Sequence, residues 1–345
     1  MKDLVRTSAF PVHPLELSSQ NNMAENKVGD NDIDYSRWME NLPNEKQLIP
    51  LTDLVIPGSH DSGTFSLDKN TEIGPDEPCL IRTLGRCCGC CGSGGCVKSV
   101  VHNWSVTQSK TIYEQLTSGI RYLDLRVAYR SKDKKIHLLH GLYGWTVQRV
   151  LDDVNRFVAE NPKEIVILDF NHFYNMDAAT RHKTLADMLI AKFGKSLRAP
   201  RGDDGPKATL QEMWGKAETI IVIYHNTDVV NAHPSFWSAQ FISSPWPNTA
   251  DVNTLMDYLK EHSAASSVSD DAFHVTQAIL TPQTKTIIKN ICSTLKDVCA
   301  RPCNRRVTAW LKTLIETKYK FNIIIADFVE IEEFIPTVIR LNYFF

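Results

Sequence analysis

Short runs of apolar residues recur along the chain, and segments of helical character separate most of them. Continuous apolar runs bounded by Gly, Pro or polar residues are typical of parallel strands that helices cover on both faces. The sequence predicts eight such strands, and eight parallel strands close most economically as a (β/α)8 barrel of the TIM type. The predicted strands are 53–56, 120–126, 136–139, 165–170, 219–224, 240–243, 273–280 and 322–328.

Amphipathic segments between these strands predict the helices. They span 36–42, 111–118, 145–160, 178–193, 252–261, 285–296 and 309–318, and Gly119 is a suitable C-cap for the second of them. Only nine residues, 127–135, separate the second and third predicted strands. Since a parallel crossover needs about a dozen residues or more, we expect an irregular α/β barrel that lacks one helix.

Length and charge bound the domain organisation. The chain has 345 residues, a formal charge of −2 and a pI of about 6.6. A barrel occupies about 250 residues, so we expect a disordered N-terminal segment, 1–35, and a single barrel domain, 36–345. The near-neutral charge argues against nucleic acid as a partner. No apolar run is long enough to span a bilayer, and the N-terminus lacks the apolar core of a signal peptide, so we expect a cytoplasmic monomer.

Polar side chains suited to proton transfer stand at the ends of several predicted strands. They are His60 and Asp61 after the first strand, Arg126 at the end of the second, His140 after the third, Asn171 after the fourth and Asp327 at the end of the eighth. The loops after barrel strands converge on one face, and the eighth strand neighbours the first, so Asp327 can reach His60. Asp124 lies two residues before Arg126, on the same side of a strand, where the two side chains can pair.

Two histidines and an arginine at one barrel mouth suit the cleavage of a phosphodiester. One imidazole can remove a proton from a nucleophilic hydroxyl while the other protonates the leaving oxygen, because the unperturbed imidazole pKa of about 6.5 lies near neutral pH. A carboxylate can hold the first imidazole in the correct tautomer. The arginine can neutralise charge that develops on the phosphoryl oxygens.

Four motifs resemble the X domain of phosphatidylinositol-specific phospholipase C, and especially the small eukaryotic proteins that carry this domain alone. They are IPGSHDS (56–62), GIRYLDLR (119–126), LHG (139–141) and LDFNHFY (168–174). The similarity continues through ADFVE (326–330) and VIRLN (338–342), so it covers about residues 36–345, with the X-box at 47–224.

The resemblance implies a phosphoric diester hydrolase that cleaves phosphatidylinositol to diacylglycerol and an inositol phosphate through a cyclic phosphodiester. His60, assisted by Asp327, would act as general base on the inositol 2-hydroxyl. His140, supported by Asp61, would protonate the diacylglycerol oxygen. The partner would be a phosphoinositide lipid at a membrane surface, reached by peripheral association, and Trp237 and Trp246 either touch that membrane or pack under loops.

The resemblance also implies that no metal or other cofactor is needed. The calcium-dependent relatives carry carboxylates where this chain has Arg126 and Asn171, and asparagine in place of Asp61. Arg126 would supply a permanent positive charge instead, as in the bacterial metal-free enzymes, and the loss of two hard oxygen ligands makes a calcium site unexpected. Asp124 would orient Arg126, and Asp124, Asn171 and Tyr224 would contact the head group, with Tyr224 stacked on the inositol ring.

Two other functions are compatible with these residues. The first is a catalytically weak phosphoinositide-binding or scaffold protein, because the positions expected to bind the head group are neutral or titratable. The second is a barrel glycerophosphodiester hydrolase. That chemistry uses a divalent ion bound by carboxylates, and Arg126 at the centre of the site disfavours such an ion.

A cysteine-rich, glycine-rich insert occupies residues 79–98. Six of the nine cysteines fall between Cys79 and Cys96. Adjacent cysteine pairs suit a single zinc ion poorly, and the stretch holds no histidine. Reversible palmitoylation beside Arg82, Arg86 and Lys98 is a second interpretation, and a flexible surface insert with reduced thiols is a third.

Overall fold

A computed structural model describes residues 33–87, 94–200, 206–264, 268–314 and 319–343. Nine strands in these ranges form one sheet, and seven of them run parallel in the order β6-β5-β2-β1-β9-β8-β7. The strands are β1 (Ile56–Ser59), β2 (Tyr122–Arg130), β3 (Lys135–His140), β4 (Leu142–Thr146), β5 (Val166–Tyr174), β6 (Ile220–Tyr224), β7 (Ile242–Ser243), β8 (Phe273–Ala278) and β9 (Ile323–Ala326).

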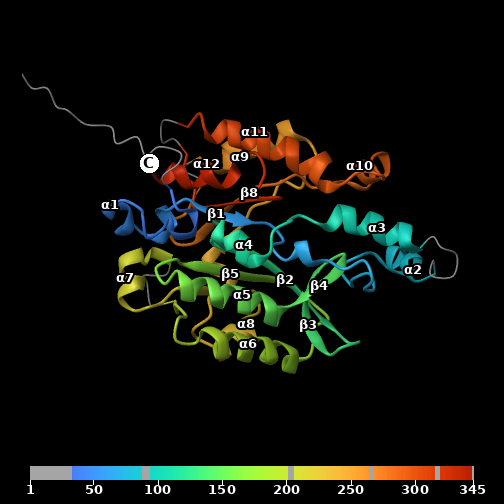
Figure 1. Cartoon of the computed structure of the whole chain (residues 1–345), viewed down its shortest axis with the longest axis horizontal. Coiled ribbons are helices and arrows are strands. Elements are labelled where there is room, and N and C mark those ends of the chain that lie inside the picture. The colour runs from blue at the N-terminus through green and yellow to red at the C-terminus, as the bar shows by residue number, and fades with distance from the viewer. Residues whose placement is uncertain (1–32, 88–93, 201–205, 265–267, 315–318, 344–345) are drawn as a thin grey trace, which may run out of the picture. The chain divides into compact units, whose positions relative to one another are not determined.

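The parallel strands form the predicted irregular barrel of the TIM type. Strand β1 lies between β2 and β9, with Ser59 opposite both Leu123 and Ala326, so the predicted neighbourhood of the first and last strands is confirmed. Every residue of β1, β6 and β9 is buried. Between β6 and β7, a single parallel bridge joins Ile223 to Trp237. Helices cover the outside of the barrel, with α5 and α6 on one side and α9, α11 and α12 on the other (Figure 1).

The third predicted strand is present as β3, but the prediction that it is a parallel strand of the barrel was wrong. Strand β3 runs antiparallel to β2, with Val127 opposite Leu138, and then pairs with β4. A tight turn that contains Lys134 at φ 58° joins β2 to β3. The nine residues between the predicted strands therefore form a hairpin, and no helix is missing, since an antiparallel pair needs no crossover.

Two strand boundaries also differ from the prediction. Residues Leu51–Asp53 form a 3-10 turn, η2, and the first strand begins only at Ile56, whose N–H donates to the carbonyl of Asn322. Strand β5 continues to Tyr174, so Asn171 lies inside a strand and not after it. The extension pairs with β2, where the register shifts between Leu125 and Arg126.

Five helices match predicted ones, although their ends differ. They are α4 (Ile112–Thr117), α5 (Val147–Glu160), α6 (Ala179–Phe193), α9 (Val252–His262) and α11 (Arg301–Leu311). Thr111 and Glu114 form a capping box at the start of α4, and Gly119, at φ +118°, follows its end. The start of the predicted helix 145–160 belongs to β4, and α11 begins well before the predicted 309. Residues 315–318 lie outside the described ranges.

Other helical segments are short. The predicted helix 36–42 is a 3-10 turn, η1 (Tyr35–Arg37), capped by the Asp34 carboxylate, so residues 34 and 35 are ordered. The rest of the predicted segment 1–35 lies outside the described residues, except Ile33. The predicted helix 285–296 is divided into α10 (Thr284–Lys289) and a π-helix, η7 (Lys296–Ala300). The elements that were not predicted include α1 (Asn44–Gln47), α7 (Leu210–Gly215), α8 (Thr227–Ala232), α12 (Phe334–Arg340), η3 (Thr64–Ser66), η5 (Ala239–Phe241) and η8 (Leu341–Tyr343).

The cysteine-rich insert contains helix α2 (Cys79–Cys87) and the start of helix α3 (Gly94–Ser105), neither of which was predicted. Val101 of α3, just beyond the insert, is buried in a cluster with Leu142 of β4, and Ile81 and Val97 of the insert pack against this cluster. Cys79 is a free, exposed thiol. The structure does not describe residues 88–93 or the side chains of residues 86–96. It therefore does not test the three interpretations for Cys87 to Cys96.

No helix within the described ranges is long and apolar enough to cross a membrane. The described residues from Asp34 onward belong to one compact unit.

Candidate active site

A cavity of about 590 Å³ opens at the carboxyl ends of the barrel strands. It is lined by most of the predicted site residues, namely His60, Asp124, Arg126, His140, Asn171 and Asp327. Asp61 lies directly behind this wall and is 2 % exposed. The sequence-based rule that polar residues at strand ends converge therefore places seven of the eight predicted residues together.

His60 is held between a carboxylate and a guanidinium. Its Nδ1 lies 2.7 Å from Oδ1 of Asp327, and since a carboxylate can only accept, Nδ1–H donates. Its Nε2 lies 3.0 Å from Nη2 of Arg126 and, in the neutral ring, accepts from it. Burial lowers the pKa of His60, but the charges of Asp61 and Asp327 outweigh burial and raise the pKa from 6.5 to about 9. At Nε2, the neutral ring therefore accepts from Arg126, and the charged ring, which carries a proton there, faces the carboxylate of Asp61.

Asp61 is the carboxylate at the centre of the site. Its Oδ1 forms an ion pair with Nε of Arg126 at 2.6 Å. Its Oδ2 has no hydrogen-bond partner in the described structure and faces Nε2 of His60 at 3.4 Å and Nε2 of His140 at 3.6 Å. Burial raises the pKa of Asp61, but Arg126, His140 and His60 outweigh it and lower the pKa. The group is therefore an anion between two imidazoles.

The backbone of Asp61 adopts a conformation that is uncommon for a residue other than glycine. Its φ is 42°, and its N–H donates to Oδ2 of Asp124 over 2.9 Å. A residue in this region is strained by about 1–3 kcal/mol and persists only when its surroundings hold it. Here the bond to Asp124 and the ion pair with Arg126 hold both ends of the residue, so the carboxylate has a fixed direction.

The carboxylate of Asp124 contacts both Arg126 and Asn171. Its Oδ2 lies 3.6 Å from Nη2 of Arg126, and its Oδ1 accepts from Nδ2 of Asn171 over 2.8 Å. Burial lowers the pKa of Arg126, but Asp61 and Asp124 outweigh it and raise the pKa, so the guanidinium is permanently charged. The pairing of Asp124 with Arg126 is thus the one that the sequence predicted.

His140 stands at the end of β3, at the rim of the cavity. Its Nδ1 lies 2.7 Å from the main-chain carbonyl of Ser105 and donates to it, because a carbonyl can only accept. Its Nε2 is then directed towards Oδ2 of Asp61. Although β3 belongs to a hairpin and not to the barrel, the hairpin brings His140 to the predicted place.

Sequence analysis missed a second group of polar residues in the cavity, centred on Asp169. Its Oδ2 accepts from the hydroxyl of Tyr122 over 2.6 Å and from Nδ2 of Asn171 over 3.1 Å. Its Oδ1 forms an ion pair with Nε2 of His225 at 2.9 Å. Burial lowers the pKa of His225, but Asp169 outweighs it and raises the pKa. Two signals could have found the group, since His225 directly follows β6 and Asp169 shares the two-residue period of Asn171.

Tyr224 does not belong to the cavity, and the prediction that it stacks on a substrate was wrong. It is fully buried, and its hydroxyl is 2.8 Å from Nδ1 of His182. Its ring stacks on Phe236 with a centroid distance of 5.9 Å. Successive side chains of a strand point to opposite faces, so His225 faces the cavity and its neighbour Tyr224 faces the covering helices.

The two tryptophans in the later loops have different environments. Trp237 is fully buried, and its Nε1 donates to the carbonyl of Arg198, so it packs under a loop. Trp246 lines the cavity and is 51 % exposed. Trp246 is therefore the one of the two that is free to contact a surface outside the protein.

Three side chains in the site are of the kinds that bind metals. One ligand atom from each of His60, Asp61 and Asp124 lies within 4.8 Å of the others, and this is the group that meets that criterion in the described residues. The guanidinium of Arg126 forms ion pairs with both of these carboxylates. A divalent ion would have to displace or oppose that cation, so the donor set fits such an ion poorly.

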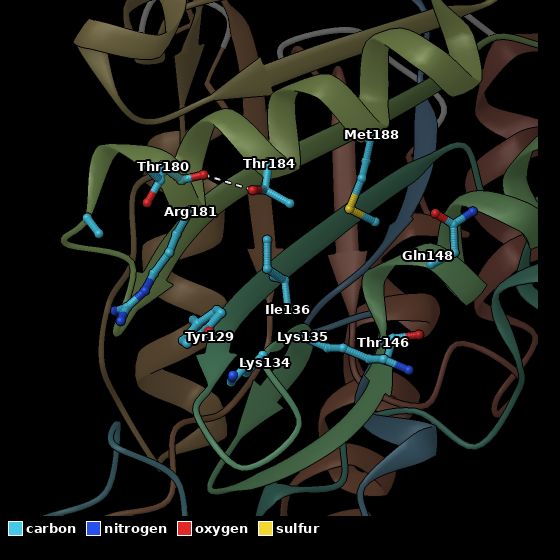
Figure 2. Close-up of a pocket in the computed structure, with 11 residues that line it drawn as sticks. Tyr129, Lys134, Lys135, Ile136, Thr146, Gln148, Thr180, Arg181, Thr184 and Met188 are labelled. Carbon is cyan, nitrogen blue, oxygen red and sulfur yellow. Dashed lines mark hydrogen bonds between the residues drawn. The ribbon is translucent and has the colours of Figure 1, made fainter.

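A second cavity, of about 680 Å³, lies outside the barrel between α6 and the β2–β3 hairpin (Figure 2). Tyr129, Lys134 and Arg181 are among the residues that line it. None of the described residues in its wall is a histidine or a carboxylate. This cavity therefore offers no imidazole or carboxylate for proton transfer among its described lining residues.

The barrel and the polar groups at its mouth define the class of the protein, which is that of the phospholipase C-like proteins. The family model for "Phosphatidylinositol-specific phospholipase C, X domain" matches residues 99–227. The predicted X-box, 47–224, starts before this match. The chain belongs to the family of PI-PLC X domain-containing proteins.

Similar proteins of this family align over almost the whole chain. PI-PLC X domain-containing protein 3 of Mus musculus is 34% identical over 319 residues, which cover 92% of this chain and 96% of that protein. PI-PLC X domain-containing protein 2 of the same organism is 37% identical over 307 residues, which cover 88% and 87%.

Solved structures of bacterial enzymes share the fold. The phosphatidylinositol-specific phospholipase C of Listeria monocytogenes has a TM-score of 0.61 and 20% identity, and the match covers 89% of this chain and 98% of that one. A pentafluoro-Phe variant of the Staphylococcus aureus enzyme has a TM-score of 0.62 and 17% identity, with 89% and 97% covered.

The raised pKa of His60 predicts how stability depends on pH. Because the pKa is 6.5 in the unfolded chain and about 9 in the folded protein, the charged ring stabilises the fold fully below pH 6.5. This contribution is lost as the pH rises through about 9. We expect the free energy of unfolding of the wild type, relative to His60→Ala, to fall by about 3 kcal/mol across this window. Urea denaturation at several pH values measures it, and a constant difference would contradict the assignment.

Proposed function

We propose that this protein is a phosphoric diester hydrolase that cleaves phosphatidylinositol to diacylglycerol and an inositol phosphate through a cyclic phosphodiester. The observation that carries this proposal is the convergence of His60 Nε2 and His140 Nε2 on one oxygen of Asp61, with Arg126 in contact with both His60 and Asp61. Membership of the PI-PLC X domain family supports the class of substrate.

In the first step, His60 acts as general base. Its Nδ1–H is held by Asp327, so Nε2 of the neutral ring carries the lone pair that accepts the proton of the inositol 2-hydroxyl. Because the pKa of His60 is raised to about 9, the share of this neutral form, and with it the rate of this step, should increase as the pH rises towards 9. The oxygen then attacks the neighbouring phosphorus of the same molecule, and this intramolecular geometry supplies much of the acceleration. Asp327 and Asp61 stabilise the imidazolium that forms.

The departing oxygen of diacylglycerol needs a proton as its bond to phosphorus breaks. His140 donates that proton from Nε2, while its Nδ1–H stays on the carbonyl of Ser105. Oδ2 of Asp61 faces this Nε2 at a distance of 3.6 Å. Arg126 neutralises the charge that develops on the phosphoryl oxygens. Water can open the cyclic product in a second step with the two histidines in reversed roles.

Exposed apolar side chains on elements near the cavity support the proposal that the substrate is a lipid in a membrane. We call these side chains the rim: Leu80 and Leu84 on α2, Ile288 on α10, Ile291 in a loop, and Trp246, which lines the cavity. Residues 279–282 and Leu295, which flank α10, line the cavity, and so does Trp104 of α3. Figure 1 shows α2, α3 and α10 at the same end of the barrel. The protein would thus bind a membrane peripherally, with its cavity facing the lipid.

Replacement of two rim residues by serine should weaken membrane binding. We expect Ile288→Ser/Ile291→Ser to lower the affinity for phosphatidylinositol vesicles about a hundredfold, since each buried isoleucine contributes about 1.5 kcal/mol or more. Sedimentation with vesicles measures this. Leu48→Ser is the matched control, because Leu48 is 57% exposed and lies outside the rim. Equal loss in both variants, or in neither, would contradict the assignment of the rim.

The central experiment incubates the purified protein with phosphatidylinositol vesicles in excess chelator and measures cyclic inositol phosphate. We expect product, and no change when calcium or magnesium is added. Activity that the chelator abolishes and calcium restores would overturn the metal-free mechanism. Retained vesicle binding with no product under any condition would instead favour a phosphoinositide-binding or scaffold protein.

A further inference from the structure

The strand end that carries His140 is fastened to the segment that precedes and includes the cysteine-rich insert. The N–H of Gly141 donates to Oδ2 of Asp76 over 2.6 Å, and its carbonyl accepts from the N–H of Gly74 over 2.7 Å. The imidazole of His140 donates to the carbonyl of Ser105, the last residue of α3. Both the backbone after His140 and its ring therefore depend on residues 74–105.

Side-chain packing fastens the helix pair α2–α3 to the same place. Val101 of α3 belongs to a buried cluster with Leu142, which lies two residues after His140. Ile81 of α2 and Val97 of α3 pack against this cluster. A displacement of α3 relative to β4 would therefore loosen the cluster and move the carbonyl of Ser105.

The turn at Gly141, directly after His140, lies close against α3. Gly141 has a φ of +68°. A Cβ at this position would lie 2.4 Å from Oγ of Ser105 and 2.8 Å from Cγ1 of Val101. Real Cβ atoms do not approach other atoms this closely, so only glycine lets α3 approach the histidine near enough for the hydrogen bond.

The two imidazoles of the site have different partners at Nδ1. His60 has a carboxylate, which stabilises the imidazolium that a general base becomes. His140 has a neutral carbonyl, which fixes the tautomer without adding a charge. A general acid becomes a neutral imidazole, so it needs only that Nδ1 keeps its proton and that Nε2 exchanges one with the leaving oxygen.

We infer that the main-chain carbonyl of Ser105 is a positioning group for His140, and that the packing of the α2–α3 pair controls protonation of the leaving group. This inference rests on the proposed function and extends it, because it makes the α2–α3 pair a part of the protein that tunes the reaction. Ser105 touches neither the substrate nor the reacting atoms in this scheme. It acts only through the direction of the imidazole.

The dependence of the rate on the leaving group separates this role from a general loss of structure. The experiment compares Val101→Ala with Val154→Ala, which removes the same atoms from a buried site in α5. Each variant is assayed on phosphatidylinositol and on a nitrophenyl inositol phosphodiester, whose leaving group departs without a proton. We expect Val101→Ala to lower turnover of phosphatidylinositol about tenfold, a part of the 10²–10⁴-fold value of a general acid, and turnover of the nitrophenyl compound by less than about twofold. Val154→Ala should affect both substrates equally. Equal losses in Val101→Ala would overturn the inference.

Nitrogen NMR of the histidine side chains tests the inference without catalysis. In the wild type, the neutral ring of His140 should carry its proton on Nδ1, and Val101→Ala and Gly141→Ala should both shift the ring towards the Nε2–H tautomer. If the wild type cleaves neither substrate, the proposed function fails, and the NMR result alone decides the positioning role. A wild-type ring that carries its proton on Nε2, or a tautomer that neither variant changes, would overturn the inference.

Discussion

His60→Ala should lower the release of cyclic inositol phosphate from phosphatidylinositol vesicles by about 10²–10⁴-fold. The reason is that Nε2 of His60 is the basic atom beside Arg126, and alanine leaves no acceptor for the proton of the attacking hydroxyl. The initial rate of product formation measures the loss. His233→Ala, at the end of α8 and outside the cavity, is the matched control and should keep the wild-type rate.

The dependence of His60 on Asp327 makes a second variant informative. Asp327→Asn should lose less activity than His60→Ala, because the ring remains but its tautomer is no longer fixed by a carboxylate. Residues that act as a unit show non-additive losses. The double variant should therefore be no slower than His60→Ala alone. A His60→Ala protein that is folded and retains more than about a tenth of the rate would contradict the assignment of His60 as the base.

Arg126→Gln should reduce both activity and stability strongly. We expect a loss of about 10²–10³-fold in turnover, because the charge that faces the phosphoryl oxygens disappears. We also expect the free energy of unfolding to fall by about 3–5 kcal/mol, since the buried carboxylate of Asp61 loses its cation. Urea denaturation and the vesicle assay measure the two effects.

A compensating change distinguishes these two effects of Arg126. Asp61→Asn removes the uncompensated charge, so Arg126→Gln/Asp61→Asn should recover most of the lost stability. It should not recover activity, because the positive charge is still absent. Recovery of turnover by added calcium would show that a metal ion can take the place of the guanidinium once Arg126 is absent.

Much of the active site could be predicted because barrel topology converts positions in the sequence into positions in space. A residue at the carboxyl end of any parallel strand reaches the same mouth, so His60, Arg126 and Asp327 could be grouped from strand ends alone. Asp124 followed from the two-residue period of a strand. These inferences needed only local patterns of apolar and polar residues.

The direction of a side chain at a strand end was harder to predict. Tyr224 and His225 are adjacent at the end of β6, and a shift of one residue decides which of them faces the cavity. The residue types alone did not separate the two, since both residues can bind a sugar. Only the packing of Tyr224 against His182 and Phe236 shows that it faces outward.

What the sequence by itself determined was the class of the fold and the types of residue at its mouth, because strand periodicity, turn residues and the four X-domain motifs are local. What only the tertiary structure decided was pairing between distant segments. It placed β3 in a hairpin, gave Asp61 Oδ2 two imidazole neighbours, and brought the carbonyl of Ser105 to His140 across 35 residues of sequence. Main-chain carbonyls are the same in every residue, so no pattern of side chains could have indicated that contact.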